Sequence, residues 1–335
     1  MRDSKRQHSD EPADSDHVGN SEKHQGRLTN ALSKAQRFCT LVAWLAVAAL
    51  ALRFLVRDRF FPFNYNFYIP PIISGGVAMV FALFAHSRAR LITIGALMVA
   101  GIPNIMIDQP RLFSRTADEN ASADFNVLSY NVKSYSFGAN KVVPYIAEMR
   151  PDVLCLVEGT FRGRAPDNVK KALGSDYNWA VGRTVSIASR FPVVESRQIV
   201  DVREVKVLRA VLATPKGRIA VYDVDVQTPG FRDDRKAFDE LYAAIADEEL
   251  PAILAGDFNV PRGSYHLNRA TKGWVDSFAE SSTDRYLATW RHRPIALWQI
   301  DHQFHTPQLE AVSADIGTSL ASDHFPLIVK YKMQQ

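Results

Sequence analysis

The stretch PAILAGDFN at residues 251–259 carries the strongest structural signal in this chain of 335 residues. It begins as a short apolar run, which is typical of a buried β-strand. It ends in Asp257 and Asn259, polar residues that a protein core seldom accepts without a purpose. Since sites in α/β sheets form at strand ends, this stretch predicts an α/β domain with a functional site at the end of one strand.

Short apolar runs of the same kind recur on both sides of this stretch. Their length and β-branched content predict strands at 125–131, 152–158, 185–189, 205–213, 218–226, 297–305 and 325–331. Two intervening segments, 140–149 and 232–248, have the apolar spacing of amphipathic helices. We therefore expect one mixed α/β domain over residues 124–335, preceded by a polar linker at 111–123.

Polar residues lie at the ends of several predicted strands or just before the last one. They are Asn131, Glu158, Asp257, Asn259, Asp301, Asp323 and His324. Oxygen ligands of the Asp, Glu and Asn type, without cysteine, suit Mg²⁺, Mn²⁺ or Ca²⁺ rather than zinc. A histidine beside acids suits a general acid or base, or a group that stabilises charge on a phosphate.

The order and spacing of these residues resemble the endonuclease/exonuclease/phosphatase family of DNase I-like phosphodiesterases. The resemblance covers roughly residues 124–332 and rests on FNVLSYN, RPDVLCLVE, AGDFN, IDH and SDHFP, which contain the polar residues above. It implies a DNase I-like four-layered α/β sandwich that hydrolyses phosphate esters with a divalent metal, Mg²⁺ or alternatively Mn²⁺ or Ca²⁺. The apolar segments before the domain make the chain look like the membrane-anchored bacterial branch of the family.

The resemblance also implies a role for each residue. Glu158 would be the principal metal ligand, with Asn131 and Asp323 near the same ion. The ion would neutralise the phosphate and the charge on the leaving oxygen.

The remaining matched residues would act on the water and the phosphate. Asp257 resembles the carboxylate that orients or deprotonates the attacking water, and Asn259 resembles an amide that positions the phosphate. His324 resembles an imidazole set against the phosphate and steered by Asp301. The proton transfer is assigned to His324 and Asp257 jointly.

One position departs from the family pattern. In VYDVDVQTP at 221–229, Asp225 stands where many members have a histidine. A histidine donates to phosphate, whereas an aspartate repels it unless a cation lies between them. A variant metal arrangement, an altered substrate, a loss of activity and a tolerated polar strand end are the alternatives.

Three apolar segments precede the domain, at about 38–56, 67–85 and 91–107 within residues 37–110. Each is expected to be a transmembrane helix. Arg53, the only charge in the first segment, is expected to extend to the interface. Aromatic residues between 60 and 68 predict an interfacial belt, and the polar residues 1–36 predict a disordered tail.

Basic residues flanking these segments give an expected orientation. One side carries Arg27, Lys34, Arg37, Arg88 and Arg90, and the other carries Arg57, Arg59, Arg111 and Arg115. The positive-inside rule then places the N-terminus in the cytoplasm. We expect a multi-pass protein of the bacterial inner (cytoplasmic) membrane with an extracytoplasmic domain.

The net charge of the chain lies almost entirely before the domain. The formal charge is +4 overall, while residues 111–335 contain 28 Lys/Arg and 28 Asp/Glu. Such a domain lacks the basic surface with which proteins hold long nucleic acids. Nucleic acid, a lipid head group and a small molecule are the candidate phosphate-ester substrates. The alternative function is a catalytically silent module on a membrane anchor that binds a phosphate ligand.

Overall fold

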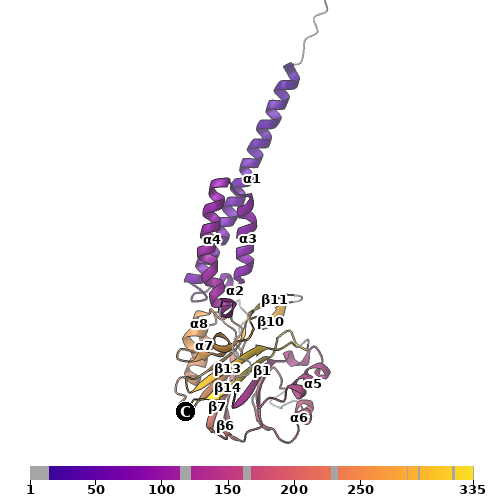
Figure 1. The fold of residues 1–335 in the computed structure, drawn as a ribbon, viewed down its shortest axis with the longest axis vertical. Helices are drawn as coiled ribbons and strands as arrows, with labels where there is room; N and C mark the ends of the chain where they lie inside the picture. The colour runs from indigo at the N-terminus through magenta and orange to yellow at the C-terminus, as the bar shows by residue number, and fades with distance from the viewer. Residues whose placement is uncertain are drawn as a thin grey trace, which may run out of the picture.

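A computed structural model describes residues 15–113, 122–160, 167–227, 233–284, 286–292, 295–318 and 321–334. Most of the expected linker and the first 14 residues of the expected tail lie outside these residues. The described chain forms a bundle of helices followed by a domain with two large sheets (Figure 1).

Each of the two large sheets has six strands. The order in the first sheet is β13 (Leu309–Ile316), β14 (Leu327–Met333), β1 (Phe125–Asn131), β2 (Val153–Val157), β4 (Val185–Ser189) and β3 (Asn178–Val181). The order in the second sheet is β5 (Val193–Asp201), β6 (Val205–Thr214), β7 (Gly217–Val226), β8 (Ala252–Asp257), β12 (Asp301–His305) and β9 (Val275–Asp276). Both sheets are mixed, since β1 and β2 are parallel, as are β7 and β8, while β14 runs antiparallel to β1 and β12 to β8.

The two sheets pack face to face around an apolar core that includes Val127, Cys155, Val221 and Ile253. Helices α5 (Ala139–Met149) and α6 (Asp167–Leu173) pack on the outer face of the first sheet. Helices α7 (Arg235–Ile245) and α8 (Tyr265–Ala270) pack on the outer face of the second, and α9 (Ser277–Ser281) lies beside β12 and β13. The sequence of layers, helix, sheet, sheet and helix, confirms the expected α/β sandwich.

A bundle of three helices stands on one end of this domain (Figure 1). It consists of α1 (Ser15–Leu55), α3 (Pro71–Phe84) and α4 (Ser87–Asp108), with the short α2 (Asn64–Tyr68) at its foot. The short helix η1 (Pro110–Phe113) follows α4. Strands β10 (Trp290–His292) and β11 (Ile295–Trp298) form a small hairpin at the end of the domain nearest the bundle (Figure 1).

The expectation of three helices long enough to cross a membrane is wrong. Among the described residues two qualify, Gln25–Leu55 within α1 and Ser87–Asp108, with mean hydropathy 2.1 and 1.8. The expected segment 67–85 yields only the 14 residues of α3. The reason is local, because Pro70 has an extended backbone and Pro71 starts a new helix, so α2 and α3 cannot merge.

Helix α1 extends further toward the N-terminus than expected. We expected a disordered tail up to residue 36, but the chain is helical from Ser15 onward. The segment RLTNALSKAQ at 27–36 contains no Pro or Gly and several strong helix formers. The apolar part of α1 therefore provides a nucleus from which the helix propagates through this polar segment.

Arg53 lies inside the foot of the bundle instead of extending to the interface as expected. Its side chain is 3% exposed. It donates to Asn104 Oδ1 at 2.9 Å and to Asp108 Oδ2 at 2.7 Å, both on α4, and to the carbonyls of Phe67 and Ile69. The charge is thus paired inside the bundle, where it joins α1, α4 and the segment around α2.

Candidate active site

The ends of the strands bring the expected residues to one end of the sandwich. In the second sheet Asp225, Asp257 and Asp301 lie side by side, since Asp257 is the register partner of both others. In the first sheet Asn131 ends β1 opposite Val157, directly before Glu158. The two sheets therefore contribute facing polar groups, as the strand-end pattern predicts.

Two of these residues have backbone conformations that favour glycine. Glu158 has φ 52° and Asn259 has φ 53°. A non-glycine residue in the left-handed region costs on the order of 1 kcal/mol or more. Glu158 directly follows β2 and Asn259 comes two residues after the end of β8, so both lie where the chain turns away from a strand.

Asn131 connects the two sheets through its side-chain amide. Its Nδ2 donates to Glu158 Oε1 at 3.2 Å and to Asp257 Oδ2 at 2.9 Å, and its Oδ1 accepts from the backbone of Lys133 at 2.9 Å. The side chain is buried, so these contacts fix its orientation. The two carboxylates are thereby held at a set separation.

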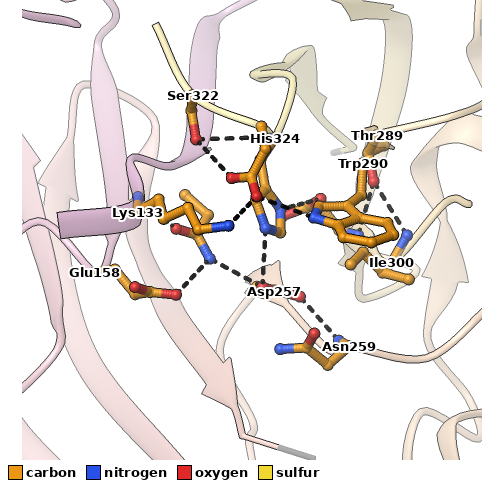
Figure 2. A network of polar contacts seen from close by, with 12 residues as sticks. Lys133, Glu158, Asp257, Asn259, Thr289, Trp290, Ile300, Ser322 and His324 are labelled. Atoms are coloured by element: carbon orange, nitrogen blue, oxygen red, sulfur yellow. Dashed lines mark hydrogen bonds and ion pairs between the residues drawn. The ribbon is translucent and has the colours of Figure 1, made fainter. Parts of the chain in front are cut away.

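His324 is held by a second group of contacts. Its Nδ1 lies 2.9 and 3.0 Å from the two carboxylate oxygens of Asp301, and its Nε2 lies 3.8 Å from Asp257 Oδ2. Ser322 Oγ accepts from the His324 backbone, and Thr289 Oγ1 accepts from the Asp301 backbone. Nδ1–H therefore points at Asp301, which leaves Nε2 facing Asp257 and the site (Figure 2).

The electrostatics of this pair keep the imidazole charged. Burial by itself lowers the pKa of His324, but the neighbouring carboxylates Asp301 and Asp257 outweigh that effect and raise the pKa to about 9. Burial raises the pKa of Asp257 well above its ordinary value, and Asp301 raises it further, while His324 opposes the rise. Asp257 is thus a carboxylate with a raised proton affinity, and it lies beside a cationic donor.

Asp323 makes contacts other than those expected of a ligand beside Glu158. Its carboxylate forms an ion pair with Lys133 Nζ and accepts from Trp290 Nε1 at 3.3 Å. The expected grouping of Asp323 with Asn131 stays a prediction. Sequence reasoning missed Lys133 and Trp290, and the one local signal was that Lys133 comes two residues after Asn131.

Asn259 is positioned by the strands around it. Its backbone N–H donates to Asp257 Oδ1 at 2.9 Å, and its side-chain Nδ2 donates to the carbonyl of Val226 at 2.7 Å. The second contact ties the residue to the end of β7. One N–H group of its side-chain amide is therefore used within the protein.

Asp225, the variant position, is buried and hydrogen-bonded. Its Oδ2 accepts from Thr184 Oγ1 and, at 3.2 Å, from Gln227 Nε2. Burial raises its pKa, and the charge of Glu158 raises it further. The aspartate is thus accommodated by neutral hydrogen-bond donors at the place where a histidine would have been a donor itself.

The donor set fits a divalent cation. The site contains more carboxylates than cationic side chains. The cations that contact the carboxylates are Lys133 and His324. The carboxylates are Glu158, Asp225, Asp257, Asp301 and Asp323. Among the described residues, Asp257, Asp301 and His324 place ligand atoms within 4.8 Å of one another. Hard oxygen ligands and uncompensated negative charge are what Mg²⁺ and similar ions require.

The fold and the site together define a class of two-sheet α/β sandwich proteins with an acidic site, suited to a metal ion, at one end of the sheets. The chain belongs to the endonuclease/exonuclease/phosphatase family, whose family model matches residues 125–324. This family comprises hydrolases of phosphate esters that generally depend on a divalent metal. No curated protein sequence matches the chain significantly.

Solved structures share the fold of the domain at low sequence identity. A humanized D. rerio TDP2 is 18% identical with a TM-score of 0.52, and the match covers 62% of this chain and 99% of that one. A family protein from Leptotrichia buccalis is 14% identical, with a TM-score of 0.51 and coverage of 62% and 100%. A mannosyl-6-phosphatase from Bacteroides thetaiotaomicron is 19% identical, with a TM-score of 0.50 and coverage of 62% and 100%. These similarities show the sandwich fold.

Proposed function

We propose that the chain is a membrane-anchored, divalent-metal-dependent phosphoesterase that hydrolyses a phosphodiester or phosphomonoester. The observation that carries this proposal is the His324–Asp301 pair, which faces Asp257 beside the linked side chains of Asn131 and Glu158. This arrangement combines a proton acceptor, a cationic donor and oxygen ligands within one buried site. The named relatives suit it, since one is a mannosyl-6-phosphatase and another, TDP2, has been solved with a single-stranded DNA product.

The residues of the site divide the reaction between them. Asp257, with its raised pKa, accepts the proton of the attacking water as the water oxygen bonds to phosphorus and the bond to the leaving oxygen breaks. His324 keeps Nδ1–H on Asp301 and offers Nε2–H to the phosphoryl group, where negative charge gathers. A proton from this pair of residues passes to the leaving oxygen.

Glu158, Asn131 and Asp323 are the residues proposed to hold the metal ion. A bound divalent ion would supply neutralisation of the phosphate and of the leaving oxygen. Asn259 is proposed to position the phosphate. Asp225 is the residue at which this site departs from the family pattern. It is therefore the residue to replace in order to test whether the natural substrate differs from that of other family members.

The anchor is part of the proposal because the helices are apolar on the outside. The apolar windows of α1 and α4 are only 22% and 17% buried, whereas a core helix of a soluble protein is mostly buried. We propose that residues 37–110 form the membrane anchor, in which α1 and α4 cross the bilayer and the shorter α3, which packs against both, carries the chain back across it between them. The basic flanks favour a bacterial inner membrane with residues 124–335 outside the cytoplasm.

The test is hydrolysis by the full chain in detergent of a chromogenic phosphodiester and monoester, with Mg²⁺, Mn²⁺, Ca²⁺ or a chelator. We expect metal-dependent turnover that falls roughly 100-fold or more in Glu158→Gln. Glu310→Gln on β13, an exposed glutamate whose register partner is Lys332 near the end of β14, is the matched control and should retain activity.

Two outcomes contradict the proposal. Turnover that persists in Glu158→Gln, or in the chelator, would come from a source other than this site. A folded, metal-supplied chain with no turnover on either ester would support the silent phosphate-binding module, and Asp225→His would then be the variant to assay.

A further inference from the structure

The foot of the helical bundle is bonded to the end of the domain that carries the site. Asp58, in the loop after α1, accepts hydrogen bonds from Ser264 Oγ and the backbone of Tyr265, which lie shortly after Asn259. Gln109, after α4, exchanges two hydrogen bonds with the backbone of Leu287. The segments that form hydrogen bonds with the bundle are thus directly connected along the chain to segments that contribute to the site.

A pair of tryptophans in the β10–β11 hairpin connects the two regions directly. Trp298 Nε1 donates to the carbonyl of Tyr68 at the foot of the bundle, at 2.9 Å. Trp290 Nε1 donates to Asp323 in the site, and the two indole rings are 5.2 Å apart. Because Figure 1 places this hairpin at the bundle-facing end of the domain, the site lies next to the bundle and not at the far end of the sandwich.

The joint between bundle and domain is polar and buried, so it fixes one orientation. Arg111 donates to the carbonyls of Ser282 and Glu280, and the side chains of Asp58, Gln109 and Arg111 are all buried. Breaking buried hydrogen bonds of this kind leaves unsatisfied polar groups. The domain is therefore docked on its anchor and does not swing freely on a linker.

Exposed aromatic residues mark the level at which this joint meets the bilayer. Phe60, Phe61, Phe63 and Tyr65 lie between α1 and α3, at the foot of the bundle, and all are exposed. Aromatic side chains in such a position occupy the head-group region of a membrane. The end of the domain that carries the site is consequently held at head-group level.

We infer that the active site acts on a phosphate ester whose other end is an apolar tail held in the bilayer. The inference rests on the proposed function and narrows the substrate to phosphate esters that are anchored in the membrane. A freely diffusing ester gains nothing from a site held at head-group level, and the balanced charge of residues 111–335 provides no long-range attraction for nucleic acid. A lipid-borne ester is instead delivered at high effective concentration by diffusion in the membrane.

The test compares two phosphodiesters with the same leaving group. The full chain, reconstituted in phosphatidylcholine vesicles, is assayed on p-nitrophenyl hexadecyl phosphate, which enters the bilayer, and on p-nitrophenyl ethyl phosphate, which stays in solution. At equal total concentration we expect the hexadecyl ester to be hydrolysed about tenfold faster or more. Asp58→Ala and Trp298→Phe, which loosen the joint, should lower turnover of the hexadecyl ester and leave that of the ethyl ester unchanged.

The control is Asp247→Ala, an exposed aspartate that lies outside the joint and the site. Equal rates for the two esters in the unmodified chain, or equal losses on both esters in the joint variants, would overturn the inference while leaving the proposed phosphoesterase intact. Absence of metal-dependent turnover on both esters would overturn the proposed function and this inference with it.

Discussion

In the proposed mechanism, Asp301 acts on the reaction through His324. Both of its carboxylate oxygens lie within 3.0 Å of His324 Nδ1, and its own backbone is held by Thr289. Such a contact fixes the tautomer and the ring orientation of a histidine and stabilises its charged form. Asp301 is therefore a positioning residue, and its charge is what matters.

Asp301→Asn removes this charge and keeps the shape of the side chain. We expect kcat to fall by roughly 10³-fold or more, with a much smaller change in KM, because the loss concerns the transition state. Steady-state kinetics with the chromogenic phosphodiester measures both constants. Asp247→Asn serves as the control, and an unchanged kcat in Asp301→Asn would mean that His324 does not depend on this partner.

His302, the next residue on β12, points away from the site and makes the domain sensitive to acid. It is buried, and its Nε2 lies 3.0 Å from the carbonyl of Val260, so that nitrogen carries the proton of the neutral ring. Burial lowers its pKa to about 4, and Arg262 adds to that effect. In the unfolded chain the pKa is about 6.5, so the unfolded state takes up the proton first as the pH falls.

The free energy of unfolding of the domain should therefore fall as the pH drops from about 6.5 to about 4. His302 alone should account for a loss of about 2 kcal/mol at pH 5. His302→Gln keeps a donor for the Val260 carbonyl and cannot titrate. Thermal unfolding at about pH 7 and pH 5 should show a smaller difference in the variant than in the unmodified chain. Equal differences in both proteins would show that His302 does not govern this loss.

Strand β8 approaches its parallel neighbour β7 unusually closely at Gly256. The residue has φ 142°, and a Cβ added there would lie 2.0 Å from the carbonyl oxygen of Val224. This close approach precedes Asp257 and aligns it with Asp225 on the neighbouring strand. The glycine of AGDFN is thus required by the packing of the sheet at the site.

Gly256→Ala should lower the free energy of unfolding by about 3 kcal/mol or more, since strain and a backbone clash add together. Gly174→Ala is the matched comparison, because Gly174 also has a positive φ but open space around it. It should cost only about 1 kcal/mol. Chemical unfolding of the two variants measures the difference, and equal losses would mean that the clash at Val224 is relieved by backbone movement.

The sequence predicted those strands that are buried apolar runs, and it failed where this signal is missing. Strands β1 and β4 have the predicted bounds. The predicted strand 297–305 is instead two strands, β11 and β12, because Thr289 binds the backbone of Ile300 and Asp301 and the chain changes its pairing partner there. Strand β5 carries mostly exposed side chains and was not predicted.

The residues of the site also divide into those that a local sequence pattern predicts and those that it does not. Residues at the ends of apolar strands, such as Asp257 and Asp301, could be found because the sequence around them is distinctive. Lys133 and Trp290 reach Asp323 from a turn and from a separate hairpin. Contacts of that kind depend on how distant segments fold together, and no local pattern in the sequence carries them.

At the scale of the whole molecule, the outer surface of the bundle differs from that of the domain. Large apolar side chains are exposed along α1, α3 and α4, whereas the described residues of the domain include only a few, among them Val194 on β5. A continuous apolar surface of this kind is stable in a bilayer and prone to association in water. The boundary between the two surfaces coincides with the foot of the bundle.

Val99→Asp places a charge near the middle of α4, where the side chain is 78% exposed. On the proposed anchor this should cost about 2.5–3.5 kcal/mol of insertion free energy. The amount of the chain recovered in the membrane fraction should therefore fall. Val194→Asp, at a residue 50% exposed on the domain, is the matched control and should leave the membrane fraction unchanged. Equal behaviour of the two variants would contradict insertion of α4.

The pairing of β1 with β14 has a consequence for how the protein is made. Strand β1 is synthesised first in the domain, yet its neighbour β14 begins at Leu327 and leaves the ribosome only after the other strands. The helices of the proposed anchor emerge before either of them, so they would be available for insertion while the sandwich is still unable to close. A nascent chain that stops before Leu327 keeps an unpaired edge on β1, which the proposed anchor would hold at the membrane, open to aggregation and to quality-control proteases.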